Sequence, residues 1–157
     1  AWRYIEAGQP EEALLAAQRA EGHPDAQAAA GSAYLQMNET QLAVDSFERA
    51  IQRDGRTYAR IANLAAARYL NGEPEAGEKL LDELLAADTY IAGSLPASVM
   101  LAAGDIELGF EFLSEAVDQR DRGALLLLTS AAFTDYRDRP EAKELASIVG
   151  LAGLSRN

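Results

Sequence analysis

The chain has 157 residues, a length that suits one domain with its own hydrophobic core. Hydrophobic residues make up 48% of it, and alanine and leucine supply much of that share, which favours helices over strands. Acidic residues outnumber basic ones by 25 to 14, giving a net charge of −11. Because that charge opposes phosphate groups, we expect no binding to nucleic acid or to an anionic membrane surface.

Other protein classes are excluded by what the sequence lacks. It has no cysteine, which excludes disulfides and thiolate metal sites but leaves both a cytoplasmic and a periplasmic location open. The apolar run at residues 124–128 is far shorter than the roughly 20 residues that cross a bilayer, so no direct membrane insertion is expected. The chain opens with Ala1 and Trp2 in what reads as the middle of a helix, so we expect it to be the C-terminal part of a longer protein.

Glycine, proline and asparagine divide the chain into helical segments. The expected helices, in chain order, cover residues 1–6, 10–21, 25–37, 39–53, 56–71 and 73–87, then a short helix from 94, another over 105–119 and a last one from 140. Pro74 suits a first helical turn, where its missing N–H costs nothing. Ser94 and Asp105 are expected as N-caps.

Small and apolar residues recur with a period of about 34 residues. The positions in the clearest unit are Gly31, Tyr34, Asn38, Ala43, Phe47 and Ala50, and those 34 residues later are Ala65, Arg68, Gly72, Gly77, Leu81 and Leu84. Fainter copies precede and follow these two. We expect the small residues to lie where two helices cross and the aromatic ones to fill the space beside them. A generic alanine-rich bundle with accidental periodicity is the alternative.

This pattern resembles the tetratricopeptide repeat, with its small-residue, Tyr, turn, Ala and Phe positions in place. The resemblance implies an all-α, right-handed superhelix of about four antiparallel helix pairs plus a C-terminal capping helix. Its units would span about residues 1–23, 24–55, 56–89 and 90–121, with a tail and cap at 122–157. Arg68 departs from the pattern, because it stands where the repeat expects a packed Tyr. We expect Arg68 to pair with an acid on a facing helix, to extend outward, or to contact a ligand.

The tail carries a second, partial resemblance through a few further residues. These are Gly104, Asp105, Phe112, Leu113, Phe133, Tyr136, Arg137, Pro140 and Leu145. They are similar to the closing segment of bacterial tetratricopeptide regions attached to adenylate cyclases, serine/threonine kinases and winged-helix transcription activators. The resemblance implies a regulatory or docking region of a bacterial signalling protein. In the last helix we expect Leu145, Ile148 and Val149 to share the face that covers the end of the stack.

The sequence shows no catalytic, cofactor or metal motif. The one histidine, His23, lies in a Gly-His-Pro turn, which makes a zinc site or a serine–histidine relay unexpected. No glycine-rich phosphate loop is present. The plentiful carboxylates, such as Glu78, Asp82 and Glu83, fit solvated helix faces. We therefore expect no enzyme, no cofactor and no bound metal.

The remaining candidate is a partner-binding groove on the concave side of the stack, formed by the first helix of each pair. The residues predicted to bind a partner are Leu35, Asn63, Tyr69, Ser98 and Leu101. Further small or neutral lining is expected from Ser32, Gln36, Ala59, Ala62, Ala66, Leu70 and Ser94. The predicted partner is a protein or peptide, or an upstream domain of the same protein docked intramolecularly. The alternatives are that these side chains pack inside the superhelix, or that the domain senses a small ligand in a closed pocket for an attached effector.

Overall fold

The computed structural model describes residues 1–151, and every element of regular structure within them is helical. The elements are α1 (Trp2–Glu6), α2 (Pro10–Arg19), α3 (Ala26–Gln36), α4 (Thr40–Asp54), α5 (Tyr58–Leu70), α6 (Pro74–Leu85), α7 (Ser94–Ala103), α8 (Ile106–Asp118), α9 (Arg122–Thr129), the 3-10 helix η1 (Ala131–Tyr136) and α10 (Pro140–Ile148). The all-α class expected from composition is confirmed.

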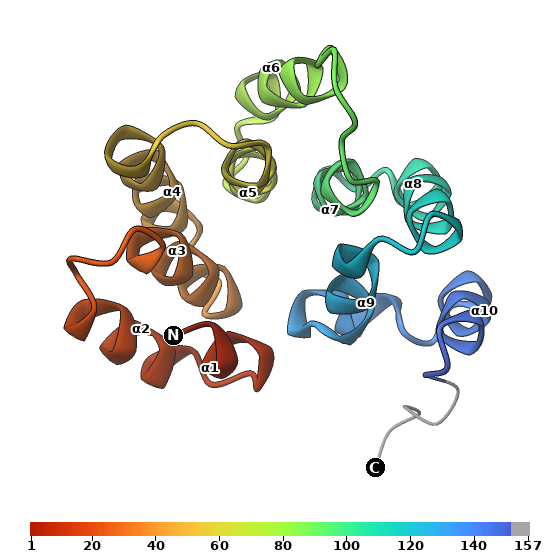
Figure 1. The fold of residues 1–157 in the computed structure, drawn as a ribbon, viewed down its shortest axis with the longest axis horizontal. Helices are drawn as coiled ribbons and strands as arrows, with labels where there is room; N and C mark the ends of the chain where they lie inside the picture. Colours follow the sequence, from red (N-terminus) through yellow and green to blue (C-terminus); the bar gives the residue numbers. More distant parts are fainter. Residues whose placement is uncertain (152–157) are drawn as a thin grey trace.

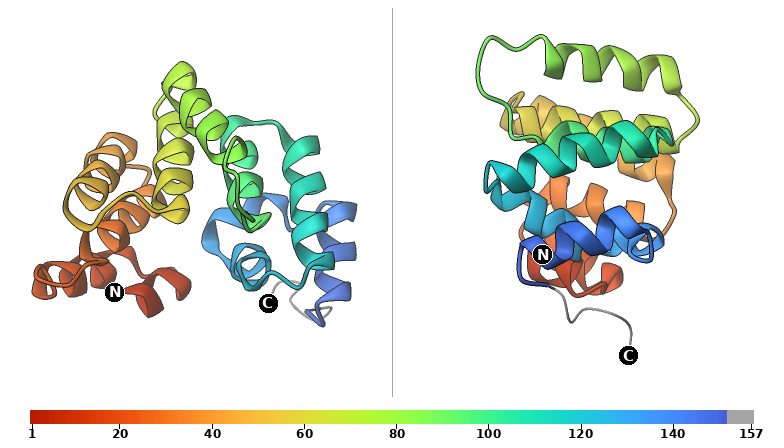
Figure 2. Two further views of the ribbon diagram at one scale, coloured as in Figure 1. Left: turned by 45° about the horizontal axis from the view of Figure 1, so that its top comes forward. Right: turned by 90° about the vertical axis from the view of Figure 1, so that its right-hand side faces the viewer.

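The helices form two rows that follow one arc, as Figures 1 and 2 show. The inner row consists of α1, α3, α5, α7 and α9, and the outer row of α2, α4, α6, α8 and α10. From α1 to α8, each inner helix packs on the outer helix that follows it, most extensively in α3–α4, α5–α6 and α7–α8, whereas α10 packs on α8. Neighbouring pairs join through the contacts of α2 with α3 and of α4 with α5, and then, within the inner row, of α5 with α7. Within residues 1–151 no helix lies across the concave side of α5, and α9 packs beside α7.

Helix boundaries follow the local chemistry of the sequence. Pro10, Pro74 and Pro140 each occupy the first turn of a helix, where no backbone N–H is required. Asp105 caps α8, its carboxylate accepting a hydrogen bond from the backbone N of Leu108 at 3.2 Å. Asn38, in the turn between α3 and α4, adopts the left-handed conformation with φ of 60° that asparagine tolerates better than most residues.

The start of α7 differs from the prediction. Ser94 is its first residue and caps nothing, since the N-cap is Gly93. Its backbone N instead donates to Asp121 Oδ2 at 3.1 Å. The other oxygen of Asp121 accepts from the backbone N of Gly123 at 2.8 Å and so caps α9. One carboxylate therefore satisfies two helix starts, which ties α7 to α9.

Within each of the three central helix pairs, α3–α4, α5–α6 and α7–α8, a large side chain packs on a glycine. A methyl group added at Gly31 would lie 2.7 Å from the Phe47 ring. In the next pair, a Cβ at Gly77 would lie 2.6 Å from Tyr69, and in the pair after that a Cβ at Gly109 would lie 2.8 Å from Leu101. The large residue is on the outer helix in the first case and on the inner helix in the other two. The expected close crossing at a small residue is thus present in these pairs. The glycine is on the inner helix in the first of them and on the outer helix in the other two.

The C-terminal end of the arc is closed by an aromatic cluster. Phe110, Phe133 and Tyr136 meet with ring centroids 5.6–6.4 Å apart, in edge-to-face or tilted geometry. The Tyr136 hydroxyl donates to the carbonyl of Leu101 at 3.1 Å, which links η1 to α7. Ala142 and Leu145 of α10 are buried in the same cluster.

Two features of the tail differ from the prediction. The sequence analysis assigns no helix to residues 122–139, where the structure has α9 in the inner row followed by η1. In α10 the covered face consists of Ala142, Leu145 and Val149, whereas Ile148 is 61% exposed. Residues 142, 145 and 149 are spaced by three and four, so they share one face, and Ile148 falls beside it.

We predict unequal effects of truncating the two large residues of α10. Leu145→Ala removes buried atoms and should lower the free energy of unfolding by about 2–5 kcal/mol. Ile148→Ala removes exposed atoms and should change it by no more than about 0.5 kcal/mol. Urea unfolding followed by circular dichroism measures both, and equal losses would contradict the observed orientation of α10.

Candidate functional site

Charge is strongly separated between the two rows of helices. The inner helices α3 and α7 contain no charged residue, and α5 contains only Arg60 and Arg68. The outer helices α6 and α8 carry one cation and eight acids, which are Lys79 and Glu75, Glu78, Asp82, Glu83, Glu107, Glu111, Glu115 and Asp118. The net negative charge of the chain therefore lies largely on the outer surface.

Both arginines of α5 are held by neighbouring groups. Arg60 donates to the backbone carbonyls of Asp54 and Gly55 at 2.7 and 3.0 Å, and to the Asp25 carboxylate at 3.0 Å. It thereby joins the end of α4 to the turn before α3. With its guanidinium engaged on three sides, Arg60 adds no free charge to the concave side.

Arg68 pairs with two carboxylates. One belongs to Glu48 on the facing helix α4 and the other to Glu73 just before α6. This confirms the expectation that Arg68 is paired with an acid on a facing helix. Asn71 extends the network, since its side chain donates to Gln41 Oε1 at 3.1 Å and to Glu73, and accepts from Thr40 Oγ1 at 2.8 Å. The network joins α4 to the turn between α5 and α6.

Three of the five residues predicted to bind a partner occupy one equivalent position. Leu35, Tyr69 and Leu101 each precede by eight residues the small residue of the following outer helix, which is Ala43, Gly77 and Gly109 respectively. Tyr69 and Leu101 make the close contacts with glycine described above. Leu35 is half-buried against the cluster that contains Ala43.

Leu101 is accordingly a core residue, only 6% exposed, and its predicted place in the groove is corrected. Tyr69 is half-buried and directed toward α6. Burial, and then the charges of Glu78 and Asp82 on α6, raise the pKa of Tyr69 above its usual value. Both side chains therefore pack between the two helices of a pair, and Leu101 is too buried to contact a partner.

Asn63 and Ser98 do lie on the accessible side of the inner row. Accessible residues of α5 recur at Ala59, Asn63 and Leu70, a spacing that places them on one stripe. The corresponding residues of α7 are Leu95, Ser98 and Ala102, all half-buried. Because α4, α6 and α7 cover the other sides of α5, this stripe faces the concave side of the arc.

The accessible stripe carries no charge and few free polar groups. Ser98 Oγ donates to the carbonyl of Leu95 at 2.7 Å, and Ser32 Oγ on α3 donates to that of Ala28 at 3.2 Å. Gln36 donates to the carbonyl of Ile5 in α1 at 2.8 Å. Asn63 is the residue of α5 whose amide remains available there. Gln36 is not accessible there, since its Oε1 is buried without a hydrogen-bond partner among the described residues. We call Ser32, Ala59, Asn63, Leu70, Leu95, Ser98 and Ala102 the inner stripe.

The wider predicted lining is partly corrected. Ala62 and Ser94 are buried, and Ala66 is at 9% exposure. The sequence analysis did not include Leu95 and Ala102. Their signal is the 32-residue spacing from Asn63 and Leu70, which becomes visible once Tyr69 and Leu101 are recognised as equivalent.

The described residues offer neither a metal site nor a membrane span. Among residues 1–151 no group of three or more His, Asp or Glu side chains is placed to hold a metal ion. Within the same range, no helix has the length and apolar character needed to cross a bilayer.

Comparison with family models, with curated proteins and with solved structures finds no match to this chain.

We predict that the Arg68 network controls the titration of Glu73. The hydrogen bond from Asn71, and then that from Arg68, lower the pKa of Glu73 below its ordinary value of 4.5. Ionised Glu73 thus stabilises the folded state above that ordinary value, and the contribution is lost as the pH falls through the lowered pKa. Asn71→Ala should raise the pKa of Glu73 and move this loss to higher pH.

Carboxyl-detected NMR titration of the wild type and of the Asn71→Ala variant makes the measurement. Glu83 provides an internal control, because Arg56, which lies outside the network, lowers its pKa. A Glu73 pKa that stays the same in both proteins would contradict the hydrogen-bonding scheme.

Proposed function

We propose that this domain is a protein-interaction module that binds a segment of a partner along the inner stripe. The observation that carries the proposal is the uncharged, accessible stripe on α3, α5 and α7 in a chain whose net charge is −11. Most of the charge is placed on the outer row, and both arginines of α5 are bonded to neighbouring groups. Such a surface can be desolvated at low cost, since no unpaired charge is buried when a partner covers it.

The chemistry of the stripe favours an uncharged segment with apolar side chains. Leu70 and Leu95 supply apolar surface, while Ala59 and Ala102 allow a partner backbone to approach closely. Asn63 can donate to and accept from a peptide group. The acidic outer surface would increase the rate of encounter with a basic partner, although it would not form part of the binding contact.

The proposal includes a tetratricopeptide-like, right-handed superhelix as the scaffold. The repeat period of about 34 residues and the two-row arc of helix pairs support it. The proposed setting is the C-terminal regulatory region of a bacterial signalling protein. In that setting the occupant of the inner stripe is either a separate protein or an upstream domain of the same polypeptide.

A photo-crosslinking amino acid at position 63 tests the proposal, with position 82 on the exposed face of α6 as the matched control. The full-length protein that contains this domain should crosslink to its partner, or to its own upstream domain, from position 63 and not from position 82. Affinity for the segment so identified is then measured by calorimetry.

We predict that Asn63→Arg weakens this binding about tenfold or more, because the partner would have to bury an unpaired charge. Asp82→Arg changes charge in the same direction on the outer row and should leave the affinity within about threefold. Circular dichroism checks that both variants are folded. Loss of binding in Asp82→Arg with full binding in Asn63→Arg would place the site on the outer row and contradict the proposal.

A further inference from the structure

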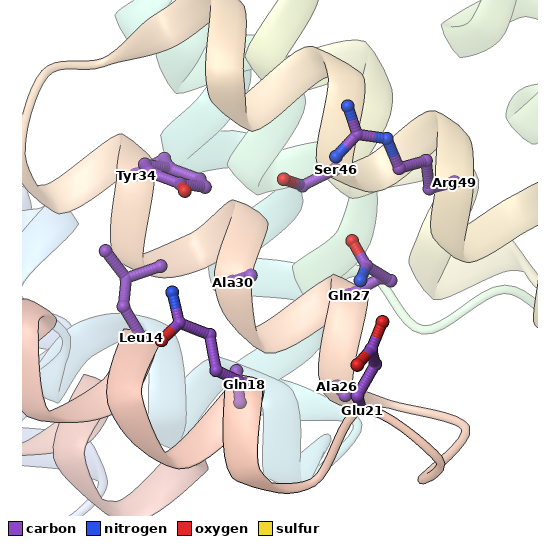
Figure 3. Close-up of a pocket in the computed structure, with 10 residues that line it drawn as sticks. Leu14, Gln18, Glu21, Ala26, Gln27, Ala30, Tyr34, Ser46 and Arg49 are labelled. Atoms are coloured by element: carbon purple, nitrogen blue, oxygen red, sulfur yellow. The ribbon is translucent and has the colours of Figure 1, made fainter.

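A separate pocket lies on the outer side of the arc, between α2 and α4, with α3 as its floor (Figure 3). Its volume is about 230 Å³, below the roughly 300–1,000 Å³ of pockets that hold drug-sized ligands. Leu14, Ala17, Ala26 and Ala30 give it apolar walls. The pocket shares no residue with the inner stripe.

Six polar side chains converge on this small space, namely Gln18, Glu21, Gln27, Tyr34, Ser46 and Arg49. None of the six makes a side-chain hydrogen bond or an ion pair with any other residue in the range 1–151. The arginines of α5 behave differently, since Arg60 and Arg68 are both fully engaged. Gln18, Glu21 and Arg49 are exposed to solvent at the rim, whereas Gln27, Tyr34 and Ser46 are partly or fully buried. The pocket therefore gathers donors and acceptors that have no protein partner within residues 1–151.

Ser46 is the most deeply buried of the six. The residue is only 2% exposed, yet its hydroxyl has no protein partner and points into the pocket toward Tyr34 (Figure 3). The oxygen remains accessible from the pocket, since it is not one of the buried polar atoms that lack a hydrogen-bond partner. A ligand oxygen in the pocket would satisfy Ser46.

The two charged residues of the pocket have opposite sign and stand on opposite walls. Arg49 belongs to α4, and Glu21 lies in the turn that follows α2 (Figure 3). A guanidinium binds a carboxylate through charge-assisted hydrogen bonds, and a carboxylate binds an ammonium group in the same way. A ligand that carries both groups would satisfy both walls, whereas a phosphate or another multivalent anion would be repelled by Glu21.

We propose that this pocket binds a small zwitterion, a free α-amino acid with an uncharged side chain. Its carboxylate pairs with Arg49 and accepts from Ser46, and its ammonium group pairs with Glu21. Its side chain lies along Leu14 and the alanines, where the amides of the two glutamines can meet a polar end. The proposal is independent of partner binding at the inner stripe, so each can fail without the other.

The twenty L-amino acids, each at millimolar concentration with the full chain, are the probes. Thermal unfolding should show that at least one amino acid with an uncharged side chain raises the melting temperature, because a ligand that binds only the folded state stabilises it. For that amino acid, calorimetry gives the affinity, and the N-acetyl and the amide derivative should each bind about tenfold more weakly or worse, since each lacks one charge.

Matched variants locate the site. Arg49→Met and Glu21→Gln should each weaken binding about tenfold or more. Arg53→Met, one turn further along α4, and Glu12→Gln on α2 lie outside the pocket and should bind like the wild type. Ala30→Leu narrows the pocket and should abolish binding while circular dichroism shows an unchanged fold.

Three results would overturn the proposal. One is that none of the twenty amino acids changes the melting temperature. Another is that the blocked derivatives bind as well as the free amino acid. The third is that Arg49→Met and Arg53→Met bind equally well.

Discussion

The architecture depends on the contact between a large side chain and a glycine inside each of the three central helix pairs. Tyr69 on Gly77 and Leu101 on Gly109 bring the inner and outer helices so close that a single added Cβ would collide. Phe47 on Gly31 does the same from the outer helix. These contacts fix the rotation of each inner helix about its own axis, because the large residue must face the glycine.

That rotation determines which side chains of the inner helices face the concave side. With Tyr69 and Leu101 turned toward the outer row, the stripe through Asn63, Leu70 and Ser98 remains on the concave side. The charges follow from the same geometry. The outer helices, which meet solvent, carry the acids, and the arginines of α5 are neutralised by bonds to α4 and the neighbouring turns.

Much of the fold could be predicted from the sequence because its signals are local. Prolines in first turns, the Asp105 cap and the turn at Asn38 mark helix ends within one or two residues. The cap supplied by Asp121 to α7 could not be predicted, since it acts across 27 residues of sequence. The helix α9 was missed because its leucine run has no clear position in the repeat, although Asp121 before it is a possible N-cap.

The candidate site was predicted in part. Periodicity predicted five groove residues on the inner helices, of which Asn63 and Ser98 are half-buried and Leu101 is buried. It does not say which side of a helix faces its partner when apolar residues occur all around, as in α7. Leu101 was misplaced for that reason, and the large-to-small contact eight residues later is the signal that resolves it. The polar pocket that Ser46 lines could not be predicted from the sequence, because its residues come from three helices.

The most direct test of this account is hydroxyl-radical footprinting of the folded chain, read residue by residue by mass spectrometry. Leucines react at similar intrinsic rates, so their labelling reports exposure. Leu70 is 50% exposed and Leu101 is 6% exposed. The account predicts that Leu70 is oxidised readily and that Leu101 is protected until the chain unfolds. Equal labelling of the two leucines in the folded protein would contradict the rotation of the inner helices and, with it, the position of the inner stripe.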